Sequence, residues 1–94
     1  AERLALLETL DTGKPLSLSR SDVETCARYF EFYGGAADKI HGEVIPASNR
    51  HLTFTVREPY GVTGHITPWN APINQAGRSA AAALAPEATS RPAG

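Results

Sequence analysis

The amino-acid sequence predicts an α/β fold in which helices flank a region of strands. Before residue 42 and again over residues 71–85, apolar side chains recur every three or four positions, which is the spacing of one helix face. Over residues 43–60 the pattern changes to alternation, which favours strands. With 94 residues, of which 41% are hydrophobic and 20% charged, the composition is that of at most one small globular domain.

The first helix is predicted over residues 1–11. Gly13 suits a left-handed C-cap, and Pro15 prevents the helix from continuing. The predicted apolar face of this helix consists of Leu4, Leu7 and Leu10. The acidic residues predicted to lie on solvated helix faces are Glu2, Glu8, Asp11, Glu31 and Asp38.

A second helix is predicted to begin near Ser21, because the Ser21 hydroxyl can cap a helix and Glu24 stands at the capping-box position. Cys26 is predicted to be a structural core residue, since it stands between Val23 and Phe30 on the apolar face and no His or helix N-terminus nearby would lower the pKa of its thiol. The predicted apolar face of this helix consists of Val23, Cys26, Ala27, Phe30, Tyr33, Ala37 and Ile40.

Residues 43–60 are predicted to form two strands joined by a turn around residues 47–50. Alternate positions of the second strand that share one face are Leu52, Phe54 and Val56. A further brief strand is predicted at residues 62–66, and Pro68 prevents it from continuing.

A third helix is predicted over residues 71–85, with a stripe of small residues that would let it lie close to a sheet. The predicted packing stripe consists of Ile73, Ala76, Gly77, Ala80 and Leu84. Residues 86–94 contain two prolines and no periodicity, so they are predicted to be coil.

The corner between the last predicted strand and helix holds the chain's only tryptophan, Trp69, beside Asn70. Asn70 stands where its side-chain carbonyl can cap the helix, and Pro72 suits the first helical turn. An amide held in this place can instead point its NH₂ group at a developing oxyanion. The spacing leaves both interpretations open, with Trp69 either packing or lining a site.

Charge and composition exclude several function classes. A net charge of −1 and a pI near 6.3 argue against a nucleic-acid or membrane-surface binder. No apolar run has the length of a bilayer span, and a single cysteine is typical of a cytoplasmic protein. No metal is expected, because His41, His51 and His65 show no metal-binding spacing with Cys or carboxylates.

The run TVREPYGVTGHITPWNAPINQAGRSAAAALA resembles the aldehyde dehydrogenase superfamily. In that family the pattern REPYGVVG-I-PWN-P leads from an oligomerisation strand into the first strand of the NAD-binding domain. Upstream, LALLETLDTGKPL and ARYFEFYGGAADKIHGEVIP resemble the two N-terminal helices of the same family. The resemblance covers about residues 1–85, and its separate segments recur in order.

The resemblance implies an N-terminal fragment with an incomplete fold. Residues 1–42 would be the N-terminal helices, and residues 43–60 a β-hairpin arm through which the full-length enzyme forms a homo-oligomer. Residues 61–85 would be the first strand-turn-helix of a partial, Rossmann-like cofactor-binding domain. Residues 86–94 depart from the family as an atypical coil tail, for which a truncated or frame-disturbed reading is expected.

The resemblance also implies a chemistry, the oxidation of an aldehyde to a carboxylic acid with NAD or NADP. Asn70 would donate its side-chain amide to the oxyanion that forms when a cysteine thiolate attacks the aldehyde. Candidate cofactor contacts are Ile66, Thr67, Pro68 and Trp69, with Arg91 as a weak stand-in for a family lysine that touches the adenosine ribose.

The catalytic cysteine and general-base glutamate of the family lie downstream of PWN, and Cys26 does not replace them. The chain alone is therefore expected to be inactive. Two other interpretations stay open from the sequence: a non-catalytic fragment that pairs through its strand edges with a homologue, and an unrelated small helix–hairpin binding module.

Overall fold

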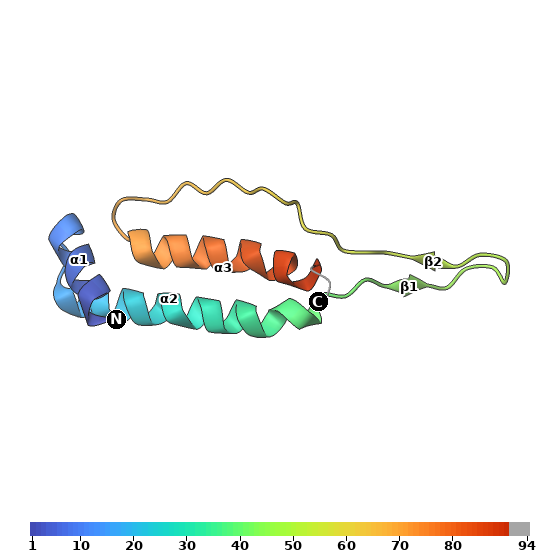
Figure 1. Cartoon of the computed structure of the whole chain (residues 1–94), viewed down its shortest axis with the longest axis horizontal. Helices are drawn as coiled ribbons and strands as arrows, with labels where there is room; N and C mark the ends of the chain where they lie inside the picture. The colour runs from blue at the N-terminus through green and yellow to red at the C-terminus, as the bar shows by residue number, and fades with distance from the viewer. Residues whose placement is uncertain (91–94) are drawn as a thin grey trace.

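The computed structural model describes residues 1–90 and combines three long helices with a small two-stranded sheet. Helices α2 and α3 lie side by side and run in the same direction, with α1 across one end and the hairpin extending beyond the other (Figure 1). The molecule is accordingly elongated, with extents of 64 × 25 × 22 Å. In chain order the elements are α1 (Glu2–Thr12), α2 (Leu16–Ala36), the short helix η1 (Ala37–Lys39), β1 (Val44–Ile45), β2 (Thr53–Phe54) and α3 (Pro72–Ser90).

Helix α1 ends at Gly13 as predicted, because Gly13 adopts a left-handed φ of 78° and its N–H donates to the carbonyl of Thr9 at 2.9 Å. The predicted apolar face of α1 is wrong. Ala5 and Glu8, three positions apart, are the buried residues, and α1 packs against α2. The leucines predicted to be buried, Leu4, Leu7 and Leu10, are all half or more exposed.

Helix α2 begins at Leu16, more than a turn before the predicted start at Ser21. Pro15 is the N-cap, and its carbonyl accepts hydrogen bonds from the N–H groups of Leu18 and Ser19 at 3.0 and 3.2 Å. The fixed φ of proline suits a helix start, so Pro15 both prevents α1 from continuing and begins α2. Ser21 therefore lies inside the helix, exposed, instead of capping it.

The contact between α2 and α3 is made by small residues. Among residues 72–88 of α3 the buried positions are Gly77, Ala81 and Ala85, spaced four apart, whereas Ala76 and Leu84 of the predicted stripe are exposed, Leu84 by 58%. A Cβ on Gly77 would lie 2.2 Å from Cys26 Sγ, so the absence of a side chain lets the two helices approach. The prediction of a slim helix is confirmed, but its partner is a helix and not a sheet.

Helix α3 continues past Pro86 to Ser90, so the predicted coil at 86–90 is wrong. Proline removes one helical hydrogen bond, and the alanines before and after it, which have the highest helix propensity, keep the helix continuous. The rest of the predicted tail, with Arg91, lies outside the described residues.

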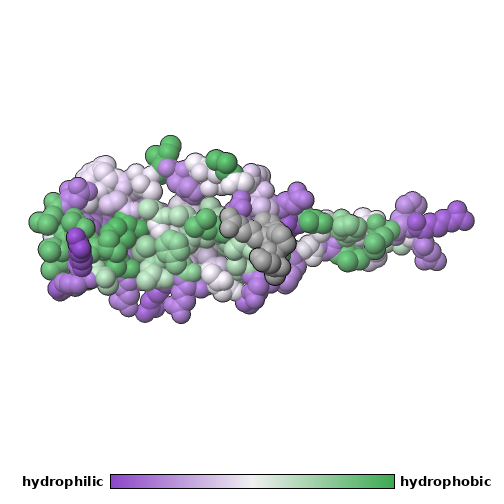
Figure 2. All heavy atoms as spheres, viewed as in Figure 1, coloured by the Kyte–Doolittle hydropathy of each residue, from purple (hydrophilic) through white to green (hydrophobic). Residues whose placement is uncertain are grey.

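The predicted hairpin is confirmed as an antiparallel pair, with Val44 opposite Phe54 and Ile45 opposite Thr53. Gly42 precedes it because a Cβ there would collide with the carbonyl of Thr55 at 1.8 Å. Figure 2 shows apolar side chains along this hairpin and at the α1 end of the molecule. Exposed apolar residues of the hairpin region are Val44, Ile45, Leu52, Phe54 and Val56.

The strand predicted at residues 62–66 does not form. The segment runs back along α3 without regular structure (Figure 1), and Val62 and Ile66 are almost fully exposed. A strand needs a hydrogen-bonded neighbour, and residues 1–90 place none beside this segment. The described part of the chain is therefore a mixed helical structure with one small sheet, and no helix in it is both long and apolar enough to cross a bilayer.

Candidate functional site

The corner at residues 66–71 connects the irregular segment to the start of α3. Trp69 and Asn70 form a turn, and Pro72 is the first residue of the helix, where its missing N–H breaks no hydrogen bond. The first carbonyl to accept a helical bond is that of Ala71, from the N–H of Gln75 at 3.0 Å. Asn70 therefore stands just outside the helix, with the positive end of the helix dipole beside it.

The side chains of the corner face solvent. Ile66, Thr67, Pro68, Trp69 and Asn70 are all exposed, Trp69 by 80%. Among residues 1–90 the Asn70 amide has no hydrogen-bond partner, so it does not act as a helix cap there. Its two N–H donors are therefore available to a ligand oxygen.

The segment before the corner is tied to α3 through His65. The Nδ1 atom of His65 is hydrogen-bonded to the hydroxyl of Ser79, which lies about two turns into α3. The Nε2 atom of the same ring is hydrogen-bonded to Thr63 Oγ1 at 2.9 Å. His65 thus joins the irregular segment to the helix that follows the corner.

The helix after the corner is tied to α2 and α1 by a chain of polar contacts. Asn74 Nδ2, in the first turn of α3, donates to Asp22 Oδ1 at 3.1 Å. Asp22 Oδ2 is paired with Lys14 Nζ at 2.7 Å, and Lys14 Nζ is also paired with Glu8 Oε1 at 3.1 Å. The Glu8 side chain is 0% exposed, and among residues 1–90 its Oε2 atom has no hydrogen-bond partner.

The prediction that Glu8 lies on a solvated helix face is wrong, because Glu8 is buried where α1 packs against α2, and there it is paired with Lys14. Two carboxylates share one ammonium in this network. The hydrogen bond from Lys14 holds the pKa of Asp22 below its ordinary value, with a further contribution from Asn74. The same bond to Asp22, aided by Glu8, raises the pKa of Lys14.

Cys26 lies next to this network and against Gly77, partly buried. Burial raises the pKa of its thiol, and the negative charge of Glu8 raises it further. A thiol in such surroundings is protonated at neutral pH and is a poor nucleophile. The arrangement agrees with the structural role expected for Cys26.

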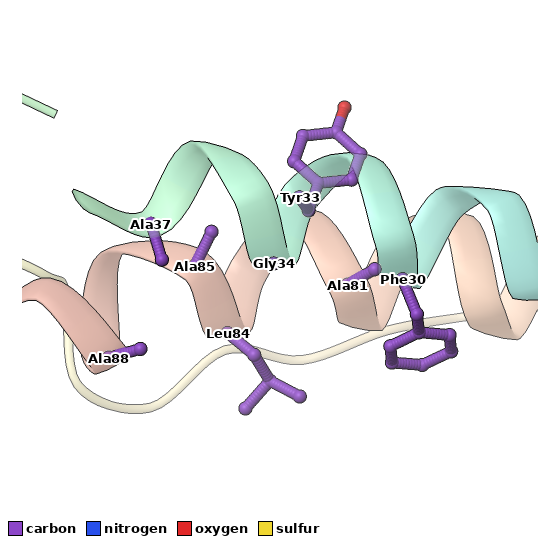
Figure 3. Close-up of a pocket in the computed structure, with 8 residues that line it drawn as sticks. All are labelled: Phe30, Tyr33, Gly34, Ala37, Ala81, Leu84, Ala85 and Ala88. Carbon is purple, nitrogen blue, oxygen red and sulfur yellow. The ribbon is translucent and has the colours of Figure 1, made fainter. Parts of the chain in front are cut away.

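A groove between α2 and α3 lies at the other half of the helix pair from the corner. Its volume is about 150 Å³, and Figure 3 shows the Phe30 and Tyr33 rings projecting in opposite directions beside it. Its lining residues are Phe30, Tyr33, Gly34, Ala37, Ala81, Leu84, Ala85 and Ala88. The lining holds no acid, base or nucleophile apart from the Tyr33 hydroxyl, so the groove offers little chemistry. In the described part of the chain, no group of three or more His, Cys, Asp or Glu side chains is placed to hold a metal.

The chain matches known proteins over most of its length. A model of the Aldehyde dehydrogenase family matches residues 1–89. The chain is 53% identical over 74 residues to the NADP/NAD-dependent aldehyde dehydrogenase PuuC of Escherichia coli (strain K12), an alignment that covers 78% of this chain and 15% of the relative. It is 49% identical over 88 residues to betaine aldehyde dehydrogenase of Bacillus subtilis (strain 168), covering 89% and 17%.

The fold is similar to that of a solved structure as well. A crystal structure of a Burkholderia cenocepacia protein described as an aldehyde dehydrogenase superposes with a TM-score of 0.88 at 59% identity, covering 90% of this chain and 18% of that one. The chain thus spans about a sixth of the length of the proteins it matches. These matches do not favour the interpretation as an unrelated helix–hairpin module. The chain belongs to the aldehyde dehydrogenase family.

Proposed function

We propose that this chain supplies the oxyanion donor, Asn70, and part of the nicotinamide-facing surface of an NAD(P)-dependent aldehyde dehydrogenase. The observation that supports the proposal is the Asn70 amide, which is exposed, has no hydrogen-bond partner among residues 1–90 and stands at the N-terminus of α3. A free amide donor beside a helix N-terminus suits an oxygen that gains negative charge.

In the proposed reaction a cysteine thiolate from another part of the enzyme forms a bond to the aldehyde carbon. The carbonyl π electrons move to the oxygen, and Asn70 Nδ2 donates a hydrogen bond to that oxyanion. When bound, NAD(P)⁺ supplies the acceptor for the hydride that leaves the same carbon. The thioester that remains is hydrolysed by a water that a glutamate from another part of the enzyme deprotonates, which yields the carboxylic acid and frees the thiolate.

The exposed side chains of the corner support a contact with a planar nicotinamide. Ile66 and Trp69 are exposed apolar side chains just before Asn70, and Thr67 and Pro68 between them are exposed as well. We assign these residues to contact the nicotinamide side of the cofactor, NAD or NADP. Arg91 is proposed as a contact to the adenosine ribose on sequence resemblance alone.

The hairpin is proposed as the oligomerisation arm of the intact enzyme. Its strands are exposed on both faces among the described residues and carry apolar side chains such as Phe54 and Val56. Such strands favour pairing with a second copy. The intact enzyme is proposed to be a cytoplasmic homo-oligomer with a Rossmann-like domain that other parts of the enzyme complete.

An Asn70→Ala variant of the intact enzyme tests the proposal. We expect kcat for aldehyde oxidation to fall by about 10²–10³-fold, which is typical for the loss of one oxyanion donor, while KM for NAD changes little. Gln75→Ala is the matched control, because it removes a side-chain amide five residues further on. We expect this variant to keep the wild-type activity. An Asn70→Ala enzyme with the wild-type kcat would refute the role of Asn70.

The chain by itself is proposed to be inactive, since Cys26 is its only cysteine and lies against Gly77 in the α2–α3 contact. The 94-residue chain, mixed with NAD and an aldehyde, is expected to produce no NADH. Turnover by this chain alone would contradict the assignment of the nucleophile to another part of the enzyme.

A further inference from the structure

The corner that carries Asn70 is held from both sides by side chains. On the preceding side, His65 is hydrogen-bonded to Ser79 of α3. On the following side, Asn74 donates to Asp22 of α2 at 3.1 Å. Between these two anchors, all five side chains of residues 66–70 are exposed, so residues 66–70 gain little support from packing.

The anchor at Asn74 is the stronger of the two, because its acceptor is itself fixed. Asp22 is paired with Lys14 at 2.7 Å, and Lys14 reaches the fully buried Glu8 side chain. Hydrogen bonds to a charged acceptor are stronger than neutral ones, and an acceptor held by a second partner loses little freedom. The network thus fixes the first turn of α3 to both N-terminal helices.

We propose that Asn74 and Ser79 are positioning residues, which hold the start of α3 and the segment before it so that the Asn70 amide keeps one direction. Asn74 acts through Asp22, Lys14 and Glu8, and Ser79 acts through His65. The inference rests on the proposed function of Asn70, because a fixed direction matters only for a donor that must meet a developing charge. Both residues are proposed to act through their contacts within the chain and not on the reacting atoms.

Trp69 provides a direct probe, since it is the chain's only tryptophan and immediately precedes Asn70. Asn74→Leu keeps a side chain of similar size and removes the amide donor, and Gln75→Leu makes the same change at a neighbouring position with no such bond. Ser79→Ala removes the α3 partner of His65, and Ser21→Ala is its control on an exposed position of α2. The fluorescence anisotropy of Trp69 is measured in the full 94-residue chain, at a temperature where circular dichroism shows native helix content.

We expect Asn74→Leu and Ser79→Ala each to lower the Trp69 anisotropy, while both controls keep the wild-type value. The backbone N–H of Gln75 makes the first helical hydrogen bond of α3, to the carbonyl of Ala71. We expect its hydrogen exchange to become about tenfold faster in Asn74→Leu, because a hydrogen bond to a charged group is lost. A role in stability alone would lower the unfolding midpoint and leave the anisotropy of the folded chain unchanged. Equal anisotropy in the wild type, the two positioning variants and their two controls would therefore overturn the inference. If Asn74→Leu fails to fold, the smaller change, Ser79→Ala, decides the question.

The intact enzyme separates this inference from the proposed function. There, Asn74→Leu is expected to lower kcat about tenfold, less than Asn70→Ala, with KM unchanged. If Asn70→Ala keeps full activity, the oxyanion role fails even where Trp69 has become mobile. If Asn70→Ala loses activity and Asn74→Leu affects neither kcat nor Trp69, the positioning role fails and the oxyanion role stands.

Discussion

Gly77 of α3 and Cys26 of α2 meet so closely that a Cβ on the glycine would lie 2.2 Å from the Cys26 sulfur and 3.3 Å from its Cβ. Asn74, which reaches Asp22, lies one helical turn before Gly77. The close approach at Gly77 and the hydrogen bond at Asn74 therefore belong to the same part of the α2–α3 contact, the part nearest the corner.

Gly77→Ala is expected to destabilise the chain by about 1–3 kcal/mol through overpacking against Cys26. The higher helix propensity of alanine offsets up to about 1 kcal/mol of that overpacking cost, so the net loss is smaller. Gly35→Ala is the matched control, because no atom lies within 4 Å of a Cβ placed there, so only the stabilising gain remains. Urea unfolding measures both variants. If the Gly77→Ala chain is as stable as the Gly35→Ala chain, α2 and α3 can move apart at Gly77 without loss of stability.

Lys14→Met is expected to lower the free energy of unfolding by about 3–5 kcal/mol, the usual cost of removing one partner from a buried ion pair. The loss arises because Glu8, whose side chain is 0% exposed, stays buried without its cation. Unfolding followed by circular dichroism measures it.

The double variant Glu8→Gln/Lys14→Met is expected to regain part of that stability, since the buried negative charge is gone. Arg28→Met is the control, because the Arg28–Glu24 pair is exposed and such pairs contribute about 0–1 kcal/mol. A double variant no more stable than Lys14→Met would contradict an electrostatic origin of the loss.

The acid dependence of stability is expected to reflect Asp22. The Lys14 ammonium holds the pKa of Asp22 below its ordinary value of 3.8 in the folded chain. The folded state therefore binds this proton less readily than the unfolded state. The resulting stabilisation is present above pH 3.8 and disappears as the pH falls through the lower, folded pKa.

Asp22→Asn is expected to reduce the loss of stability between about pH 4 and pH 2, because the titrating carboxyl is gone. Asp38→Asn serves as the control. Lys39 also lowers the pKa of Asp38, but that pair is exposed and is screened in 0.5 M salt. The loss of stability of Asp38→Asn at acid pH is therefore expected to stay close to that of the wild type. Urea midpoints measured over this range check the prediction, and identical acid limbs for Asp22→Asn and wild type would contradict it.

Local signals predicted the elements that are governed by local chemistry. Gly13 ends α1 in the left-handed conformation that glycine favours, and the alternation at residues 52–56 predicted the hairpin. The sequence pattern places the start of α2 too late, because Pro15 prevents α1 from continuing and also serves as the N-cap of the next helix. Val62–Ile66 has a strand pattern, but a strand depends on a neighbour that the described residues do not provide.

The residues of the corner predict a candidate site there, whereas nothing in the sequence predicts the polar network behind it. Asn70 stands out as an amide at a helix start, and that signal lies within a few residues. The bond from Asn74 to Asp22 joins positions 52 residues apart, and nothing in either helix pattern indicates it. Glu8 was predicted to be solvated because acidic side chains on amphipathic helices usually are, and only the packing of α1 on α2 reverses this.

The alkylation rate of Cys26 reports on Glu8. Burial and the nearby Glu8 carboxylate both raise the pKa of the thiol. Glu8→Gln removes the negative charge and is expected to lower that pKa, so that reaction with iodoacetamide near pH 8 becomes faster by less than about tenfold. Glu24→Gln, an exposed change two positions from Cys26 on the same helix, is expected to leave the rate unchanged.

A full rate–pH profile separates charge from access, because Glu8→Gln also alters the packing of α1. The midpoint of the profile reports the pKa of the thiol, and its plateau at high pH reports how readily the reagent reaches the sulfur. We expect Glu8→Gln to move the midpoint to lower pH, and in urea the two chains should react at the same rate. A change in the plateau with an unmoved midpoint would show that Glu8 shields Cys26 by packing and not by its charge.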